Sequence, residues 1–216
     1  MGVPVKSLWQ ALRKRWLLYH IGLPEFAFLL EPPPPDEWVS LDCETTGLKV
    51  GVDEIVSIGA VRIVGDRILA SERFEVLVRP QGKVSAQSIR IHRLREKDVV
   101  DGLPADDAVK RLLYFIGSRP LVGYYLEFDV AMLNRVVFPL LGWGLPQRKI
   151  EVSALYYNYK MGQMNAMQRQ SSPDIDLRLA TLMHDLGLPL REAHNPVNDA
   201  IMAGLAFIKL RHLLTK

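Results

Sequence analysis

Cysteine is almost absent from this chain, since Cys43 is the single one among 216 residues. One cysteine excludes an intrachain disulfide and any zinc site built from several thiolates. Such sparse use is typical of a reducing compartment, so we expect a cytoplasmic protein. Cys43 itself is expected to be a core residue.

Long apolar runs are also missing, although 49% of the residues are hydrophobic. No run reaches the roughly 20 residues that cross a bilayer, and the basic start lacks a signal-peptide core followed by a small-residue cleavage site. The 24% charged content and the abundance of Leu, Val and Ile argue against disorder. We therefore expect a soluble folded protein with no membrane partner.

A strong charge of one sign is lacking as well. The formal net charge is +3 and the pI is near 9.0, which permits a polyanionic partner without requiring one. The basic excess is local, because residues 1–20 contain no acid. Their cations would form one face of a short helix, which is either a solvated surface or a contact for a nucleic-acid backbone. These cations are Lys6, Arg13, Lys14 and Arg15.

Hydrophobic periodicity predicts strands first and helices afterwards. β-Branched runs over 38–44, 54–64 and 68–78, with Gly65-Asp66-Arg67 between the last two, predict a three-stranded antiparallel meander. Short apolar strands at 120–124 and 149–153 then alternate with segments of helical spacing, which predicts an α/β fold with a mixed five-stranded sheet flanked by helices. The predicted helices are 104–117, 127–141, 154–167, 176–186 and 197–214.

The length fits one domain with an extension. Apolar residues at three- and four-residue spacings predict an amphipathic helix over 7–21. Pro32 to Pro35 follow and can neither continue a helix nor donate to a sheet, so we expect an extended spacer there. We therefore predict a helical arm and linker over 1–36 and a main domain over 37–216.

The predicted strand at 38–44 carries two acids, Asp42 and Glu44, before it breaks at Thr45-Thr46-Gly47. Side chains alternate along a strand, so both carboxylates project from the same face. An acid-x-acid triplet arises roughly three times by chance in a chain of ordinary acidic content, so the spacing alone proves little. Its place on a buried strand is informative, because buried acids need a cation or hydrogen bonds.

Two further places combine chemical side chains with a helix start. Asp129 follows Phe128 at the turn between a short strand and a helix, and Asp199 lies five residues after His194, where Pro196 suits the first turn of the last helix. A lone histidine of this kind is more often a surface or core residue than a functional one. Beside several acids it becomes a candidate general base, since histidine side chains generally titrate near neutral pH.

In combination, these motifs resemble the three exonuclease motifs of the DnaQ-like DEDDh 3′-to-5′ exonuclease family. The motifs are Asp42-x-Glu44 with Thr-Thr-Gly-Leu, Phe128-Asp129, and His194 with Asp199, and the resemblance covers roughly residues 37–210. It implies a ribonuclease H-like fold. The chain departs from the family where Gly123-Tyr-Tyr-Leu-Glu127 replaces the frequent His-Asn before Phe-Asp, and where Arg93 follows the family-like pair Ile91-His92.

Four carboxylates repel one another, and hard oxygen ligands select Mg²⁺ or Mn²⁺ over softer metals. The resemblance implies two such ions, a general base at His194, and release of nucleoside 5′-monophosphates. It assigns the metal ligands to Asp42, Glu44, Asp129 and Asp199, which with His194 form the catalytic set. It also implies that Thr45, Gly47 and Leu48 bind the terminal nucleotide.

The partner implied by the resemblance is a nucleic acid with a 3′ end, preferentially single-stranded, with DNA ranked ahead of RNA and with a DNA polymerase as a protein partner. Two alternatives remain. One is a non-catalytic module of the same fold that binds nucleic acid or a polymerase, against which the complete acidic set argues. The other is an RNA-trimming exonuclease, because contacts to the 2′-hydroxyl leave no motif.

Overall fold

The computed structural model describes residues 12, 15–19, 22–82, 84–85, 88–90, 93–165, 167 and 174–215. Its centre is a five-stranded sheet in the order β3-β2-β1-β4-β5. β1 pairs antiparallel with β2, which pairs antiparallel with β3, whereas β4 and β5 add in parallel on the other side of β1. The predicted meander with parallel strands is confirmed. The strands are β1 (Glu37–Thr45), β2 (Ile55–Val64), β3 (Arg67–Leu77), β4 (Leu121–Gly123) and β5 (Lys149–Glu151).

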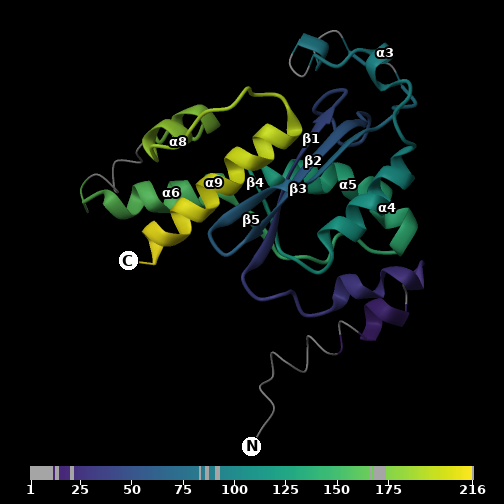
Figure 1. Cartoon of the computed structure of the whole chain (residues 1–216), viewed down its shortest axis with the longest axis horizontal. Coiled ribbons are helices and arrows are strands. Elements are labelled where there is room, and N and C mark those ends of the chain that lie inside the picture. The colour runs from purple at the N-terminus through teal and green to yellow at the C-terminus, as the bar shows by residue number, and fades with distance from the viewer. Residues whose placement is uncertain are drawn as a thin grey trace, which may run out of the picture.

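Helices cover both faces of the sheet (Figure 1). The apolar side chains of β1 at Val39, Leu41 and Cys43 join the core beneath α4 and α5, as expected for Cys43. Trp38 points to the opposite face and meets Phe207 of α9 edge to face, with ring centroids 5.3 Å apart. The helices are α3 (Glu96–Val99), α4 (Ala105–Ile116), α5 (Leu126–Leu141), α6 (Val152–Gln163), α8 (Leu179–Asp185) and α9 (Pro196–Leu214).

α9 crosses the sheet at very short range because glycine occupies the contact. A Cβ atom added at Gly59 of β2 would lie 2.3 Å from the carbonyl carbon of Pro196, far inside any real contact. Farther along α9, a Cβ at Gly204 would lie 3.1 Å from Cδ1 of Ile68. A glycine within a strand often marks such a close backbone approach. Gly59 therefore fixes how near the first turn of α9 comes to the middle of the sheet.

The chain before the sheet packs on the same core. A 3₁₀ helix, η1 (Pro24–Leu30), was not predicted, and it buries Phe26 and Leu29. The ring of Phe26 lies 5.1 Å from that of Tyr114 on α4. Of the helix predicted over 7–21, Leu12 and residues 15–19 are described and are helical, with Leu17 buried in the core; Lys6, Arg13 and Lys14 lie outside the described residues.

Three predicted boundaries were wrong, two of them for local polar reasons. The strand predicted over 149–153 ends at Glu151, because the Glu151 carboxylate accepts a hydrogen bond from the Ser153 amide and caps the start of α6. That helix ends at Gln163 rather than 167, and part of the following segment lies outside the described residues. α8 begins at Leu179 rather than 176, because Asp176 turns back onto the Arg178 amide.

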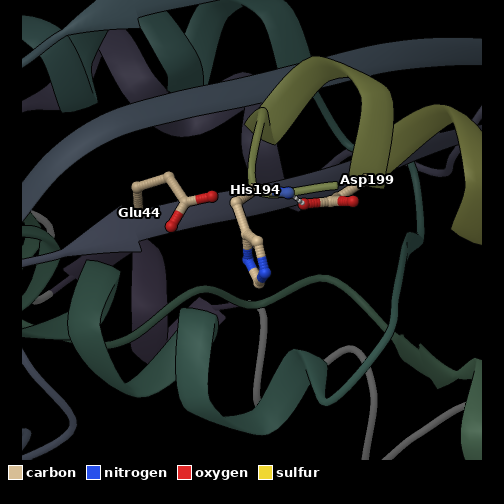
Figure 2. Close-up of side chains that lie close together, drawn as sticks. All are labelled: Glu44, His194 and Asp199. Carbon is tan, nitrogen blue, oxygen red and sulfur yellow. Dashed lines mark hydrogen bonds between the residues drawn. The ribbon is translucent and has the colours of Figure 1, made fainter. Parts of the chain in front are cut away.

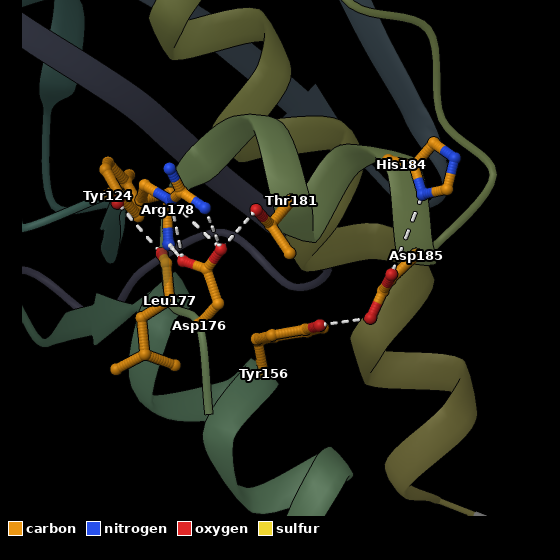
Figure 3. Close-up of polar contacts among 8 residues, drawn as sticks. All are labelled: Tyr124, Tyr156, Asp176, Leu177, Arg178, Thr181, His184 and Asp185. Atoms are coloured by element: carbon orange, nitrogen blue, oxygen red, sulfur yellow. Dashed lines mark hydrogen bonds and ion pairs between the residues drawn. The ribbon is translucent and has the colours of Figure 1, made fainter. Parts of the chain in front are cut away.

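α8 is held by polar contacts at both ends (Figure 3). Asp176 also accepts from the Thr181 hydroxyl at 2.7 Å. At the other end, the Tyr156 hydroxyl of α6 and the Lys160 ammonium donate to the same oxygen of Asp185, at 2.5 and 2.9 Å. These contacts join α8 to α6 on the α9 side of the sheet. No helix within the described residues combines the length and apolar character needed to cross a membrane.

Candidate active site

Asp42 and Glu44 lie at the carboxyl end of β1 on the face that α9 covers. Asp42 pairs with Gly59 of β2, the residue against which α9 packs, and Glu44 pairs with Ser57. Glu44 is only 8% exposed. The expectation that both acids share one face while Cys43 faces the other is confirmed.

Asp129 reaches the end of β1 from the first turn of α5. β1 pairs with β4 only through Val39 and Ser40, so the later Cys43 N–H has no partner on that strand. It donates instead to Oδ1 of Asp129 at 3.1 Å. Asp129 is 4% exposed, and this hydrogen bond fixes one of its oxygens against the strand that carries Asp42 and Glu44.

His194 and Asp199 are set by the start of α9. Asn195 is the N-cap, whose side chain accepts from the Asn198 amide at 3.0 Å, and Pro196 takes the first position, as predicted. Asp199 accepts from the His194 amide at 2.9 Å. His194 has a φ of 62°, which few residues other than glycine adopt, so the chain turns sharply before the helix.

Glu44, His194 and Asp199 come together in space (Figure 2). One ligand atom from each lies within 4.8 Å of the others, with Glu44 on one side of the imidazole and Asp199 on the other. Asp42 and Asp129 are not part of this group at that spacing. They adjoin it, because the charges of Asp129, Asp199 and Glu44 all act on Asp42.

Burial penalises the ionised forms of all four carboxyls, and repulsion between carboxylates adds to it for Asp42, Glu44 and Asp129. Burial, followed by the charge of Asp199, raises the pKa of Glu44 to about 7. Burial is also the main cause that raises the pKa of Asp42, with repulsion from its three neighbours next. The pKa values of Asp129 and Asp199 are raised by burial as well, against the opposing hydrogen bonds from the Cys43 and His194 amides. A nearby cation would remove this penalty.

The donor set fits a hard divalent cation. Oδ1 of Asp199 is buried and has no hydrogen-bond partner, which is costly unless a ligand takes that place. The carboxylate oxygens beside it are the ligand type that suits Mg²⁺ and Mn²⁺, whereas the His194 imidazole is not a ligand that Mg²⁺ prefers. The Cys43 thiol faces the opposite core, and burial raises its pKa, so no thiolate competes for the ion.

The turn after β1 is held together by Asp53, a residue that was not predicted from the sequence. Asp53 accepts from the Thr46 hydroxyl at 3.1 Å and from the Lys49 amide at 2.7 Å. An added Cβ at Gly47 would lie 2.6 Å from the Asp53 carboxylate, so the group that approaches this glycine is Asp53. An acid at the end of a turn that also contains glycine is the signal that would have singled it out.

The same turn is attached to the rest of the molecule at several points. The Thr46 amide donates to the Glu54 carbonyl, so it is already engaged, and the Ser85 hydroxyl donates to the Thr46 carbonyl at 3.0 Å. Arg135 of α5 donates to the Asp53 carbonyl. Leu48, predicted to contact the terminal nucleotide, is 82% exposed. His92, which follows β3 in the sequence, lies outside the described residues.

A mixed sheet of this order with helices on both faces is the ribonuclease H-like fold. A family model for exonucleases of the RNase T type matches residues 39–207. The chain belongs to this exonuclease family, and the family predicted from the motifs is confirmed.

Two curated relatives show where such sequences occur. A DNA polymerase III subunit epsilon-like protein of Rhodobacter capsulatus is 30% identical over 179 residues, covering 80% of this chain and 23% of that protein. A PolC-type DNA polymerase III of Thermotoga maritima is 25% identical over 179 residues, covering 83% of this chain and 12% of that protein. The chain therefore spans less than a quarter of the length of either relative.

Solved structures share the fold. E. coli exonuclease I in complex with a dT13 oligonucleotide superimposes with a TM-score of 0.64 at 16% identity, covering 81% of this chain and 40% of that chain. Exonuclease X in complex with 5′-overhanging duplex DNA gives 0.57 at 22% identity, covering 81% and 91%. At such low identity the likeness shows the fold alone, and the predicted ribonuclease H-like architecture is confirmed.

Proposed function

We propose that this exonuclease acts from 3′ ends on DNA, with a divalent metal requirement, and releases nucleoside 5′-monophosphates. The observation that carries the proposal is the group of Glu44, His194 and Asp199, whose ligand atoms lie within 4.8 Å of one another beside Asp42. The exonuclease I and exonuclease X structures that share the fold hold DNA, which favours DNA over RNA as the substrate.

The metal ligands in this proposal are Asp42, Glu44, Asp129 and Asp199, and the ions are two Mg²⁺ or Mn²⁺. When bound, such ions would supply the chemistry that phosphodiester hydrolysis needs, a lowered pKa for the attacking water and positive charge beside the phosphate. The chain's own groups orient the site: the Cys43 amide holds one oxygen of Asp129, and the His194 amide holds one oxygen of Asp199. Asp199 keeps its second oxygen free of protein partners.

His194 is the proposed general base. Its imidazole lies beside Glu44 and Asp199 yet is exposed, so a nitrogen can accept a proton from an attacking water and pass it to solvent. The two neighbouring carboxylates would stabilise the imidazolium that forms. This assignment needs no movement of the buried acids.

End-labelled oligonucleotides test the direction of cleavage. With Mg²⁺ or Mn²⁺, 3′-labelled DNA should lose its label at once as a mononucleotide, while 5′-labelled DNA shortens stepwise. Chelator should stop both reactions, and an RNA oligomer of the same sequence should react more slowly. Label release from the 5′ end first, or activity that survives chelation, would contradict the proposal.

Thr45, Gly47 and Leu48 are proposed to hold the terminal nucleotide, with the exposed Leu48 side chain against the last base. A paired end must first be unpaired and unstacked, which costs a few kcal/mol, so single-stranded or mismatched 3′ ends should be cut faster than blunt duplex. Leu48→Ala should raise KM without weakening Mn²⁺ binding. Val52→Ala, which truncates another exposed apolar side chain of the same turn, is the matched control and should leave KM unchanged.

The proposal extends to the arm and to partners. Residues 1–36 are proposed as an arm of the domain over 37–216, with Arg15 among the cations available to a nucleic-acid backbone. Deleting residues 1–31 should lower the melting temperature, because Phe26 and Leu29 leave the core, and should flatten the salt dependence of DNA binding if the cations touch phosphates. The names of the relatives also support a DNA polymerase as partner and a cytoplasmic location.

A further inference from the structure

The first turn of α5, which carries Asp129, has no cap of its own. Its N-cap residue, Tyr125, has φ 53° and ψ 35° and supplies no side-chain acceptor to the helix. A left-handed conformation is uncommon and costly for an aromatic residue, so neighbouring groups must hold it. The amides of a helix start also need acceptors, because they have no partners within the helix.

Glu151 supplies those acceptors from the end of β5. Its Oε1 accepts from the Tyr125 amide at 2.9 Å and its Oε2 from the Leu126 amide at 2.7 Å. Oε1 also accepts from the amide and the hydroxyl of Ser153, at 3.0 and 2.8 Å. One carboxylate therefore closes the N-termini of α5 and α6 together.

The helix start that Glu151 holds is connected to the buried acids of the site. Glu151 pairs with Gly123 in the sheet, so it lies at a fixed place beside the strand that precedes α5. Asp129 lies in the first turn of that helix and is hydrogen-bonded to the Cys43 amide of β1. A shift of the first turn of α5 would move Asp129 relative to Asp42 and Glu44.

We propose that Glu151 is a positioning residue that sets the place of Asp129 in the metal site by holding the left-handed Tyr125 turn. Glu151 lies outside the proposed set of metal ligands, and both of its oxygens accept N–H or O–H groups. The proposal rests on the metal site proposed above. Outer hydrogen-bond partners of metal ligands typically change metal affinity by 10- to 100-fold when they are lost.

The test measures Mn²⁺ affinity from the electron paramagnetic resonance signal of the free ion, independently of hydrolysis. Glu151→Gln keeps the volume but replaces one acceptor with an NH₂ group that faces backbone amides. We expect it to weaken Mn²⁺ binding by about 10-fold, the lower end of that range, because Glu151 acts on Asp129 only through the Tyr125 and Leu126 amides. In an Asp129→Asn background the same change should weaken Mn²⁺ binding by less than about 2-fold, because the ligand through which it acts is gone.

The Glu151 charge also acts directly on Asp129, whose pKa it raises. Asp185→Asn controls for the loss of a carboxylate that joins two helices elsewhere in the fold, since Asp185 accepts from the Tyr156 hydroxyl of α6. It should leave Mn²⁺ affinity unchanged in both backgrounds. Ser153→Ala, which removes one donor to Glu151, provides a milder variant if Glu151→Gln does not fold. It should weaken Mn²⁺ binding less, again only when Asp129 is present.

The outcomes separate this inference from the proposed function. If Asp129→Asn weakens Mn²⁺ binding but Glu151→Gln does not, the positioning role is wrong while the metal site stands. An equal loss from Glu151→Gln in both backgrounds would mean that its charge or general stability acts instead, which also overturns the inference. If Asp129→Asn leaves affinity intact, the proposed ligand set fails and the inference fails with it.

Discussion

The acids on β1 and α5 and the histidine before α9 are held in opposite ways. Glu44 is 8% exposed and lies on a central strand. Asp129 is 4% exposed and lies on a helix whose first amides donate to a carboxylate outside that helix. His194 is exposed and left-handed, on a segment whose neighbour Glu192 pairs with Arg93 at 2.7 Å on the surface. Such exposed ion pairs contribute at most about 1 kcal/mol.

This contrast follows from what each group must do. Carboxylates that hold cations act more strongly where water is excluded, and they must not move as charge develops. A general base has to return its proton to solvent, so exposure is useful to it. Under the proposed function, the buried side of the site would supply fixed charge, and the exposed side would supply proton exchange.

The strongest way to break the buried side is to remove one of its acids. Asp199→Asn, or Asp42→Ala, should lower hydrolysis by about 10³-fold or more, since the metal ions supply several kcal/mol. The fold should persist, and the melting temperature in chelator should rise because repulsion is relieved. Oligonucleotide assays and thermal unfolding measure both. Activity within 10-fold of wild type in either variant would remove these residues from the metal site.

On the exposed side, His194→Ala should lower kcat by roughly 10² to 10⁴-fold with little effect on Mn²⁺ affinity. The rising limb of the pH profile should disappear with the base. His184→Ala is the control, because that histidine is exposed on α8 and belongs to a different group of contacts. A large loss of Mn²⁺ affinity would make His194 a ligand rather than the base.

The distance between the two sides is set by Gly59. Gly59→Ala forces the first turn of α9 away from β2, which should cost about 1 to 3 kcal/mol of stability. A displacement near 1 Å can lower the rate by about 10²-fold, so activity should fall more than folding explains. Gly51→Ala, where an added Cβ meets nothing within 4 Å, is the matched control. Equal activity in the two variants would mean that α9 tolerates the shift.

The smallest effect concerns the stability of the metal-free protein against pH. The folded-state pKa of Glu44 is raised from 4.5 to about 7, so the native state holds the proton longer than the unfolded chain. Its contribution to the free energy of unfolding is therefore present below about pH 4.5 and is lost as the pH rises through about 7. The raised pKa values of Asp42, Asp129 and Asp199 act in the same direction.

Thermal unfolding in chelator should accordingly give a lower melting temperature at pH 8 than at pH 5.5, and Mn²⁺ should restore it at pH 8. Glu44→Gln should flatten the dependence. Exposed acids with lowered pKa values, such as Asp66 and Asp98, act in the opposite sense only below their ordinary value of 3.8, outside this window. A melting temperature that rises between pH 5.5 and pH 8 in chelator would contradict the prediction.

The fold was predictable because its elements are strongly periodic and its strands are rich in β-branched residues. The acids on one face of β1 and the start of α9 at Pro196 were also predictable, since period-two alternation and N-cap chemistry are local rules. η1 was not, because a short apolar run such as Phe26 to Leu30 has no period of its own. Its helical form depends on packing against α4.

The residues that hold the site in place were not predicted from the sequence, for a related reason. Glu151 and Asp53 are ordinary acids until their partners are known, and the amides that bind Glu151 belong to a segment far from it in the chain. Gly59 sits in a strand run where glycine is noticeable, yet its partner Pro196 comes from the last described helix. Motifs predict which side chains do chemistry, whereas the groups that hold them become evident only in three dimensions.

The late position of Asp199 in the chain has a consequence for synthesis. Chains emerge from the ribosome with the N-terminal end first, so β1 to β5 and α5 are available before α9 exists. Asp42, Glu44 and Asp129 can then meet, but the acid and the histidine at the start of α9 are still missing. A nascent chain that stops before residue 194 lacks His194 and Asp199, so we expect no nuclease activity until the last described helix has docked on Gly59.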